Sequence, residues 1–274
     1  MNDPRPTPPP PAPAVLRLAE LLVRDRWEAV AEGLYREVAA LANAGPGVEI
    51  FVAGCGDGVT TELLARRTGA AVTGADPDPA MIQKAEARAR EHGTPLTYEV
   101  AALDDLPFET DVFDCALGAP GLAAARDPER ALRELVRVTK PMGTVLLIQP
   151  TWTANLSTRL RTALSERLGV LPRHVVEWKR QLREAGVVEI DVQDWGDGGQ
   201  PLARLSTGAI ETVAPELTWK HKVQIVSHAW RRFGLKGTRE AVAREEDLLR
   251  ELARDRALAL VLFSGVKWPH ARPA

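Results

Sequence analysis

The most prominent candidate for ligand binding is a short glycine-rich segment, Gly54-Cys55-Gly56-Asp57-Gly58. It follows the apolar run Val48–Ala53 and precedes Thr60–Arg67, whose composition favours a helix. Small residues between a strand and a helix let the backbone turn sharply and approach a ligand closely. Taken alone, the pattern fits ligand contact and a simple tight turn equally well, because unrelated nucleotide and phosphate binders use similar loops.

A carboxylate stands about twenty residues further along the chain, the spacing that ribose-binding acids show after such loops. The apolar segment Ala71–Ala75 ends in Asp76-Pro77-Asp78. A carboxylate at this strand end would lie beside the glycine loop and accept hydrogen bonds from ribose hydroxyls. The alternative role for Asp76 is to cap the helix expected from Pro79 onward. We favour the ribose role because of the position of Asp76 at the strand end.

The elements around these residues alternate between strand and helix. Hydrophobic periodicity and turn residues predict this order. The expected strands are Val48–Ala53, Ala71–Ala75, Leu96–Val100, Phe113–Leu117 and Thr144–Ile148, and the expected helices are Thr60–Arg67, Pro79–His92 and Pro128–Thr139, with a turn at Pro141-Met142-Gly143 before the last of these strands. Such alternation predicts an α/β fold with a doubly wound, mostly parallel, Rossmann-like sheet.

The remaining segments extend this core on both sides. Residues 1–14 are proline-rich and predict a disordered tail, and residues 15–274 are expected to form one domain around a core at 48–150. We expect residues 196–254 to be a helical insertion that caps the domain. The other expected elements are helices at Val15–Val23, Trp27–Ala42, Leu156–Leu168, Val175–Ala185, Leu217–Gly234 and Thr238–Arg254, a strand at Val187–Val192 and an antiparallel last strand at Ala257–Val266.

Charge and hydropathy limit the classes of partner. The 274 residues carry a formal net charge of −2, which gives no general electrostatic reason to bind nucleic acid or an anionic membrane. The longest apolar runs are far shorter than the roughly 20 residues that span a bilayer, and the first residues lack the apolar stretch of a secretory signal. We therefore expect a cytoplasmic protein with no membrane contact and no nucleic-acid partner. The sequence leaves the oligomeric state open.

Neither cysteines nor histidines form a recognisable reactive or metal-binding group. Cys55 and Cys115 are the only cysteines, and nothing adjacent supplies an activating base. His221 and His228 are seven residues apart on an expected helix, but no further ligand completes a metal set. We therefore predict no metal site and name no catalytic residue.

Several segments together resemble a known family. Residues 48–150 are similar to the ubiquinone/menaquinone-biosynthesis type of class I S-adenosylmethionine-dependent methyltransferase domain. The similarity includes the glycine loop, the run Val72–Met81 that contains the acidic strand end, and five shorter motifs: Leu106-Pro107-Phe108, Phe113-Asp114, Asp127-Pro128, Ala131-Leu132 and Val138-Thr139-Lys140-Pro141-Met142-Gly143. These segments occur in the family's order, which makes them more specific than the loop alone.

The resemblance implies S-adenosylmethionine as cofactor and methyl transfer as the activity. It assigns the glycine loop to the methionine end of the cofactor, Asp76 to the ribose and Met81 to the adenine face. The implied cofactor-binding residues are Gly54, Cys55, Gly56, Asp57, Gly58, Asp76, Pro77, Met81, Leu103, Asp104, Leu117 and Gly118. Because the family transfers the methyl group in a single displacement, positioning of donor and acceptor suffices, and no catalytic triad is required.

Two positions differ from the family pattern and keep alternatives open. Val52 stands where the family usually has an acid, and Ala102 stands where it commonly has an aspartate near the adenine. Loss of one charged hydrogen bond, about 1.5–3 kcal/mol, weakens binding roughly ten- to hundredfold. We expect a small-molecule methyl acceptor. The alternatives are a catalytically silent cofactor-binding module, or a methyltransferase for protein or nucleic acid that uses the basic segment Lys220–Lys222.

Most tryptophans follow the motif-bearing half of the chain. Ordinary packing explains them most simply, because large indoles are usually buried. An aromatic pocket for the methyl acceptor is the alternative. The residues concerned are Trp152, Trp178, Trp195, Trp219, Trp230 and Trp268.

Overall fold

The computed structural model describes residues 33–152, 158, 161–162, 165, 172–195 and 258–269. The chain divides into two compact units, and nearly all described residues belong to the larger one, Arg26–Asn155, Pro172–Ile210 and Arg256–Ala274. The predicted tail at 1–14 and the predicted cap at 196–254 lie outside the described residues, as do the helix expected at Val15–Val23 and most of the one expected at Leu156–Leu168.

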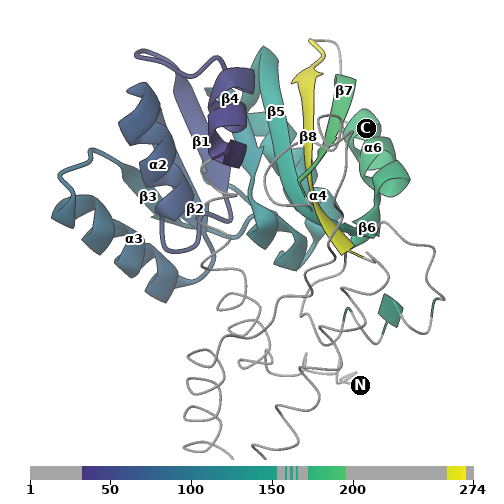
Figure 1. Ribbon diagram of the computed structural model, residues 1–274, viewed down its shortest axis with the longest axis horizontal. Helices are drawn as coiled ribbons and strands as arrows, with labels where there is room; N and C mark the ends of the chain where they lie inside the picture. Colours follow the sequence, from purple (N-terminus) through teal and green to yellow (C-terminus); the bar gives the residue numbers. More distant parts are fainter. Residues whose placement is uncertain are drawn as a thin grey trace, which may run out of the picture. The chain divides into compact units, whose positions relative to one another are not determined.

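A single mixed sheet organises the larger unit, with the strand order β3-β2-β1-β4-β5-β8-β7 (Figure 1). Neighbouring strands from β3 to β5 pair in parallel, whereas β8 is antiparallel to both β5 and β7. The predicted parallel sheet with an antiparallel last strand is therefore confirmed. The strands are β1 (Glu49–Ala53), β2 (Ala71–Asp76), β3 (Thr97–Val100), β4 (Phe113–Gly118), β5 (Thr139–Trp152), β6 (Arg173–His174, paired to the end of β5), β7 (Val187–Asp194) and β8 (Leu258–Lys267).

Helices cover both faces of this sheet. Figure 1 shows α2 and α3 near the β3 end and α6 near the β7 end. Proline at the first helical position and an aspartate before it start α3 and α4, because Asp78 and Asp127 accept hydrogen bonds from backbone amides of the first turn. The helices are α2 (Val59–Thr68), α3 (Pro79–Glu91), α4 (Pro128–Val138) and α6 (Val175–Glu184), with a 3-10 helix η1 (Pro120–Ala124) and a helical segment at residues 33–41.

Two hydrophobic clusters form, one on each face, because the central strands alternate their side chains between faces. Phe51 and Leu147 point into the cluster that contains Trp178 of α6 and residues of α4. Ile50 and Leu146, one position earlier, point into the cluster made with residues 33–41 and α2. Central strands buried on both faces are what the continuous apolar runs of β1 and β5 require.

The start of β5 differs from the prediction. The turn expected at Pro141-Met142-Gly143 does not separate α4 from a later strand, because β5 already begins at Thr139. Met142 has a left-handed backbone with φ 62°, and the β4–β5 register shifts between the pairs Phe113–Thr139 and Cys115–Thr144. The turn residues therefore form a bulge within the strand, which accommodates extra residues without ending the pairing.

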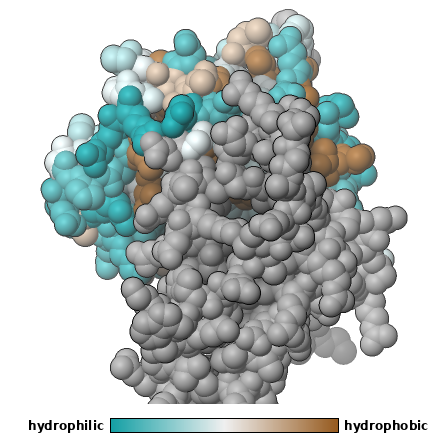
Figure 2. Space-filling view, viewed as in Figure 1, coloured by the Kyte–Doolittle hydropathy of each residue, from teal (hydrophilic) through white to brown (hydrophobic). Residues whose placement is uncertain are grey.

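The surface of the described residues is mainly hydrophilic on the face shown in Figure 2, where apolar residues form separate small patches. Among the described residues, no helix combines the length and the low polarity that crossing a membrane requires.

Candidate functional site

The glycine loop lies at the carboxyl end of β1, where the strand order reverses direction between β1 and β4. Open α/β sheets bind ligands at this kind of position. The loop is fixed to the next strand, because the amides of Gly54 and Cys55 both donate to the carbonyl oxygen of Ala75, at 2.8 and 3.0 Å. The path of the loop is therefore set by the sheet before any ligand binds.

The three loop glycines are required for different reasons. All have positive φ values, 74° at Gly54, 55° at Gly56 and 83° at Gly58. A Cβ atom at Gly54 would lie 3.1 Å from backbone atoms of Gly121 in η1, and one at Gly58 would lie 2.5 Å from the hydroxyl of Tyr98. Among the residues that the structure describes, no atom would lie within 4 Å of a Cβ at Gly56. Gly54 and Gly58 thus make room for the protein itself, whereas Gly56 borders open space that a ligand can fill.

Asp76 links the second strand to this open position. Its Oδ2 accepts a hydrogen bond from the amide of Gly56 at 3.0 Å, and its Oδ1 accepts one from the amide of Asp78 at 3.0 Å. The structure gives the helix-capping role to Asp78, whose carboxylate accepts from the amide of Ala80 at 2.8 Å. Each oxygen of a carboxylate accepts more than one hydrogen bond, so Asp76 retains capacity for ribose hydroxyls beside Gly56.

The first turn of α2 faces the same loop. Its N-cap residue is Gly58, which makes no side-chain capping bond. The first amides of a helix carry a partial positive charge and favour anions. The end of α2 is therefore suited to a carboxylate group of an amino-acid-like ligand.

The other predicted cofactor residues fall into two groups. Pro77 is exposed, Met81 and Asp104 are partly exposed, and Asp57 is partly exposed and pairs with Arg88 at 3.5 Å. Leu103, Leu117 and Gly118 are buried, and the two leucines belong to the hydrophobic clusters. A ligand would therefore contact Leu103 and Leu117 through their backbone rather than their side chains.

The two departures from the family pattern also have different settings. Val52 is fully buried in the cluster beneath α2, where an apolar side chain suits its surroundings. Ala102 is exposed just after β3.

Both cysteines are poor nucleophiles. Burial, followed by the nearby charge of Asp76, raises the pKa of Cys55 to about 12, and burial raises the pKa of Cys115 to about 12. Both thiols therefore stay protonated at neutral pH, and the thiolate is the reactive form. Among the described residues no group of three or more His, Cys, Asp or Glu side chains is arranged to hold a metal ion. His221 and His228 lie outside that part of the chain.

A family model described as "Methyltransferase domain" matches residues 51–147, which run from β1 to β5 and include the loop and Asp76. These residues form a class I methyltransferase domain. Enzymes of this family use S-adenosylmethionine as methyl donor, and the cofactor resemblance predicted from the sequence is confirmed at the level of the family.

Curated relatives of this methyltransferase match only part of the chain. An uncharacterized protein of Mycobacterium tuberculosis is 40% identical over 114 residues, which are 42% of this chain and 40% of that protein. The uncharacterized methyltransferase YodH of Bacillus subtilis is 31% identical over 157 residues, 56% of this chain and 66% of YodH. The chain thus spans well under half the length of its mycobacterial relative.

Solved structures share the fold over more of the chain. The cyclase SpnF matches with a TM-score of 0.66 at 20% identity. The match covers 91% of this chain and 94% of the SpnF chain. Geranyl diphosphate C-methyltransferase from Streptomyces coelicolor, solved with S-adenosyl-L-homocysteine, has a TM-score of 0.63 at 18% identity and covers 85% of this chain and 75% of its own. At these identities the likeness concerns the fold alone.

The sequence patterns did not identify Gln149, which supports the edge of the sheet where the candidate site lies. This fully buried side chain donates from Nε2 to the carbonyl oxygens of Gly118 at 3.3 Å and Ala119 at 2.8 Å, and its Oε1 has no partner in the described part of the chain. It fixes the corner where β4 leads into η1, whose Gly121 packs against Gly54. A polar residue directly after the buried run Val145–Ile148, near the carboxyl end of a strand, was the available signal.

Two tyrosine–threonine pairs at the first turn of α2 could not be predicted from the sequence either. Thr60 donates to the hydroxyl of Tyr35 at 2.7 Å, and the hydroxyls of Thr61 and Tyr98 are 2.7 Å apart. The partners are 25 and 37 residues apart in the chain, so no periodic pattern connects them.

Proposed function

We propose that this protein transfers the methyl group of S-adenosylmethionine to a small-molecule acceptor. The observation that supports this most is the open space at Gly56 beside the Asp76 carboxylate, at the sheet edge of a methyltransferase domain. A backbone with no side chain and a carboxylate with spare acceptor capacity match an amino-acid moiety joined to a ribose.

Bound S-adenosylmethionine supplies an electrophilic methyl group on a sulfonium sulfur. The loop and the first turn of α2 would hold its amino-acid part, through the approach that Gly56 permits and the amides that Gly58 leaves uncapped. Asp76 would accept hydrogen bonds from the ribose hydroxyls and thereby fix the donor's orientation. Alignment of donor and acceptor contributes most of the rate enhancement in such a displacement, so the rigid loop is the relevant catalytic device.

A small acceptor is supported by the net charge of −2 and by the nature of a structural neighbour. Geranyl diphosphate C-methyltransferase is described as binding geranyl-S-thiolodiphosphate, a small organic molecule. We further propose a cytoplasmic location for this protein.

A second function is a cofactor-binding module without methyl transfer. Two observations favour it: the apolar Val52 and Ala102 at positions where the family has acids, and the likeness to SpnF, which is described as a cyclase. Binding of the cofactor with no turnover across a broad acceptor panel would support this function over the first.

Calorimetric titration with S-adenosylhomocysteine tests cofactor binding, and a matched pair of glycine variants tests its location. Gly56 and Gly93 both have positive φ, 55° and 63°, and open space at the Cβ position. G56A and G93A therefore carry a similar backbone strain of about 1–2 kcal/mol. We expect G56A to weaken binding at least tenfold and G93A to bind as the unchanged protein does.

Two results would count against the proposal. One is the absence of heat from a well-folded protein at millimolar cofactor. The other is equal weakening of binding in G56A and G93A, which would show that the effect comes from strain and not from the loss of ligand space.

A further inference from the structure

A chain of hydroxyl groups connects β3 with the glycine loop. The Thr61 hydroxyl donates to the carbonyl oxygen of Gly58 at 2.7 Å. A hydroxyl has a single proton, so the 2.7 Å contact between Thr61 and Tyr98 must have the tyrosine as donor. The order of donation is therefore Tyr98 to Thr61 to Gly58.

This chain of hydroxyl groups is protected from solvent at Thr61. Thr61 is fully buried, and burial raises the pKa of Tyr98 above its ordinary value, so the phenol remains a proton donor throughout the neutral range. In such surroundings water competes little for the donors and acceptors of a hydrogen bond.

The lack of a side chain at Gly58 makes room for the hydroxyl chain. A Cβ atom there would lie 2.5 Å from the Tyr98 hydroxyl oxygen and 2.8 Å from the Cβ of Ala85. The carbonyl of Gly58 also accepts the amide of Glu62 at 3.0 Å, while its own amide donates to Cys55 at 3.1 Å. Gly58 is thus the last residue of the loop and the N-cap of α2, and the orientation of its carbonyl group affects both.

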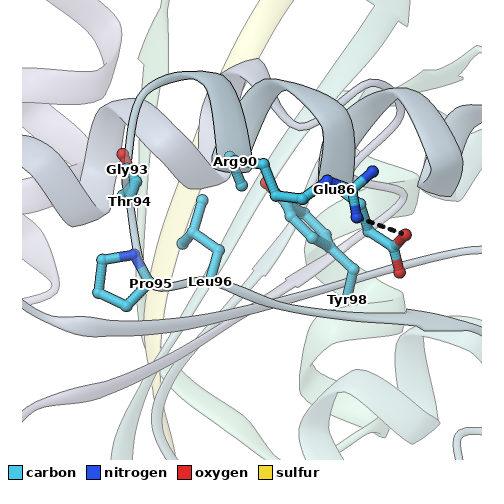
Figure 3. A pocket seen from close by; sticks show the side chains of 8 residues that line it. Glu86, Arg90, Gly93, Thr94, Pro95, Leu96 and Tyr98 are labelled. Atoms are coloured by element: carbon cyan, nitrogen blue, oxygen red, sulfur yellow. Dashed lines mark ion pairs between the residues drawn. The ribbon is translucent and has the colours of Figure 1, made fainter.

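The ring of Tyr98 also borders a second part of the fold. It lines an open groove of about 440 Å³ between α3 and β3, where Figure 3 shows it pointing from the strand toward the helix that carries Glu86 and Arg90. The ring therefore has its own packing against α3, and replacement by phenylalanine removes the hydroxyl while leaving this packing in place.

We propose that Tyr98 is a positioning residue for cofactor binding, which acts through Thr61 to hold Gly58 and, with it, the open position at Gly56. The inference rests on the proposed function, since it concerns the same loop. Tyr98 touches no reacting atom in this account, and its effect is on cofactor affinity rather than on the chemical step.

The test compares Y98F, T61V and T61S with T139V. Thr139 offers a matched control, because its hydroxyl is also buried and donates to a backbone carbonyl oxygen, that of Leu135, at 2.8 Å. Thr139 is the first residue of β5. We expect Y98F and T61V to raise the Kd of S-adenosylhomocysteine about 3- to 10-fold, the range that one net hydrogen bond gives. With cofactor saturating, kcat should be unchanged, and T61S should restore the affinity.

Amide hydrogen exchange supplies a readout that needs no ligand. The amide of Gly56 donates to Asp76, so its exchange reports the loop directly. We expect the Gly56 amide to exchange faster in Y98F and T61V than in the unchanged protein. In T139V we expect a lower thermal stability but no change in the exchange rate at Gly56.

Unchanged Kd and unchanged exchange in Y98F would overturn the inference, and so would equal effects in Y98F and T139V. If the unchanged protein binds no cofactor, the proposed function fails. The exchange measurement then still decides whether Tyr98 positions the loop.

Discussion

The glycine-loop region and the β5–α6 region satisfy their polar groups differently. Around the loop, both oxygens of Asp76 and the hydroxyls of Thr60 and Thr61 have partners within the protein. On β5 and α6, three buried polar atoms have no partner among the described residues: Gln149 Oε1, Trp178 Nε1 and Gln181 Oε1. Near the loop, the corresponding atom is Arg88 Nε, whose guanidinium still pairs with Asp57.

The two regions therefore differ in how completely their buried polar atoms are hydrogen-bonded. A buried polar atom without a partner costs about 1–3 kcal/mol, so such atoms are normally few. The protein's own groups hold the loop in place, as the proposed cofactor site requires. The β5–α6 region retains unused hydrogen-bonding capacity in a well-packed core.

The largest expected effect tests the first half of this comparison. Because a methyl group at Gly58 meets the Tyr98 hydroxyl and Ala85 in addition to a positive φ, we expect G58A to lower the free energy of unfolding by roughly 2–5 kcal/mol. G56A should lose only the strain contribution of about 1–2 kcal/mol. Urea unfolding measures both. Equal losses would show that the loop is not closely packed at its helix end.

A smaller effect tests the second half. In Q149M the carbonyls of Gly118 and Ala119 lose their donor, but the unpartnered Oε1 is also removed. These contributions oppose each other, so we expect the free energy of unfolding to change by less than about 1 kcal/mol. T61V removes a paired hydroxyl with no such relief and should cost more. If Q149M costs as much as T61V, the two regions do not differ as described.

The smallest effect at neutral pH concerns the two thiols, Cys55 in the loop and Cys115 in β4. Burial raises the pKa of each to about 12, whereas an unfolded thiol titrates near 8.5. The folded state therefore holds these protons longer, and the stability they contribute is complete below about pH 8.5 and is lost as pH rises toward 12. The raised pKa values of Tyr35 and Tyr98 act in the same direction.

Urea unfolding between pH 8 and 10.5, in reductant, measures this dependence. We expect stability to fall with pH and to fall less steeply in the C55A–C115A double variant. A slope that the double variant leaves unchanged would show that the thiols are not buried as described.

Much of the fold could be predicted because the evidence for it is local. The alternation of apolar runs with helical segments predicted β1, β2, α3 and α4 close to their observed bounds. The bulge at Met142 could not be predicted, because a turn and a bulge use the same residue types, and only pairing with β4 distinguishes them.

The candidate site could be predicted less completely, because its details depend on contacts between distant residues. The sequence presents Gly54, Gly56 and Gly58 as equivalent, whereas contacts with η1 and β3 account for Gly54 and Gly58 but not for Gly56. Likewise, the sequence suggested Asp76 as a possible helix cap, whereas the structure assigns that role to Asp78.

The central claim is that the open position at Gly56, beside Asp76, receives the cofactor. A crystal structure of the protein with S-adenosylhomocysteine tests it most directly. The account predicts ribose hydroxyls within hydrogen-bonding distance of the Asp76 carboxylate and the amino-acid portion against Gly56. Ligand bound elsewhere, or a loop that closes this space in the crystal, would contradict it.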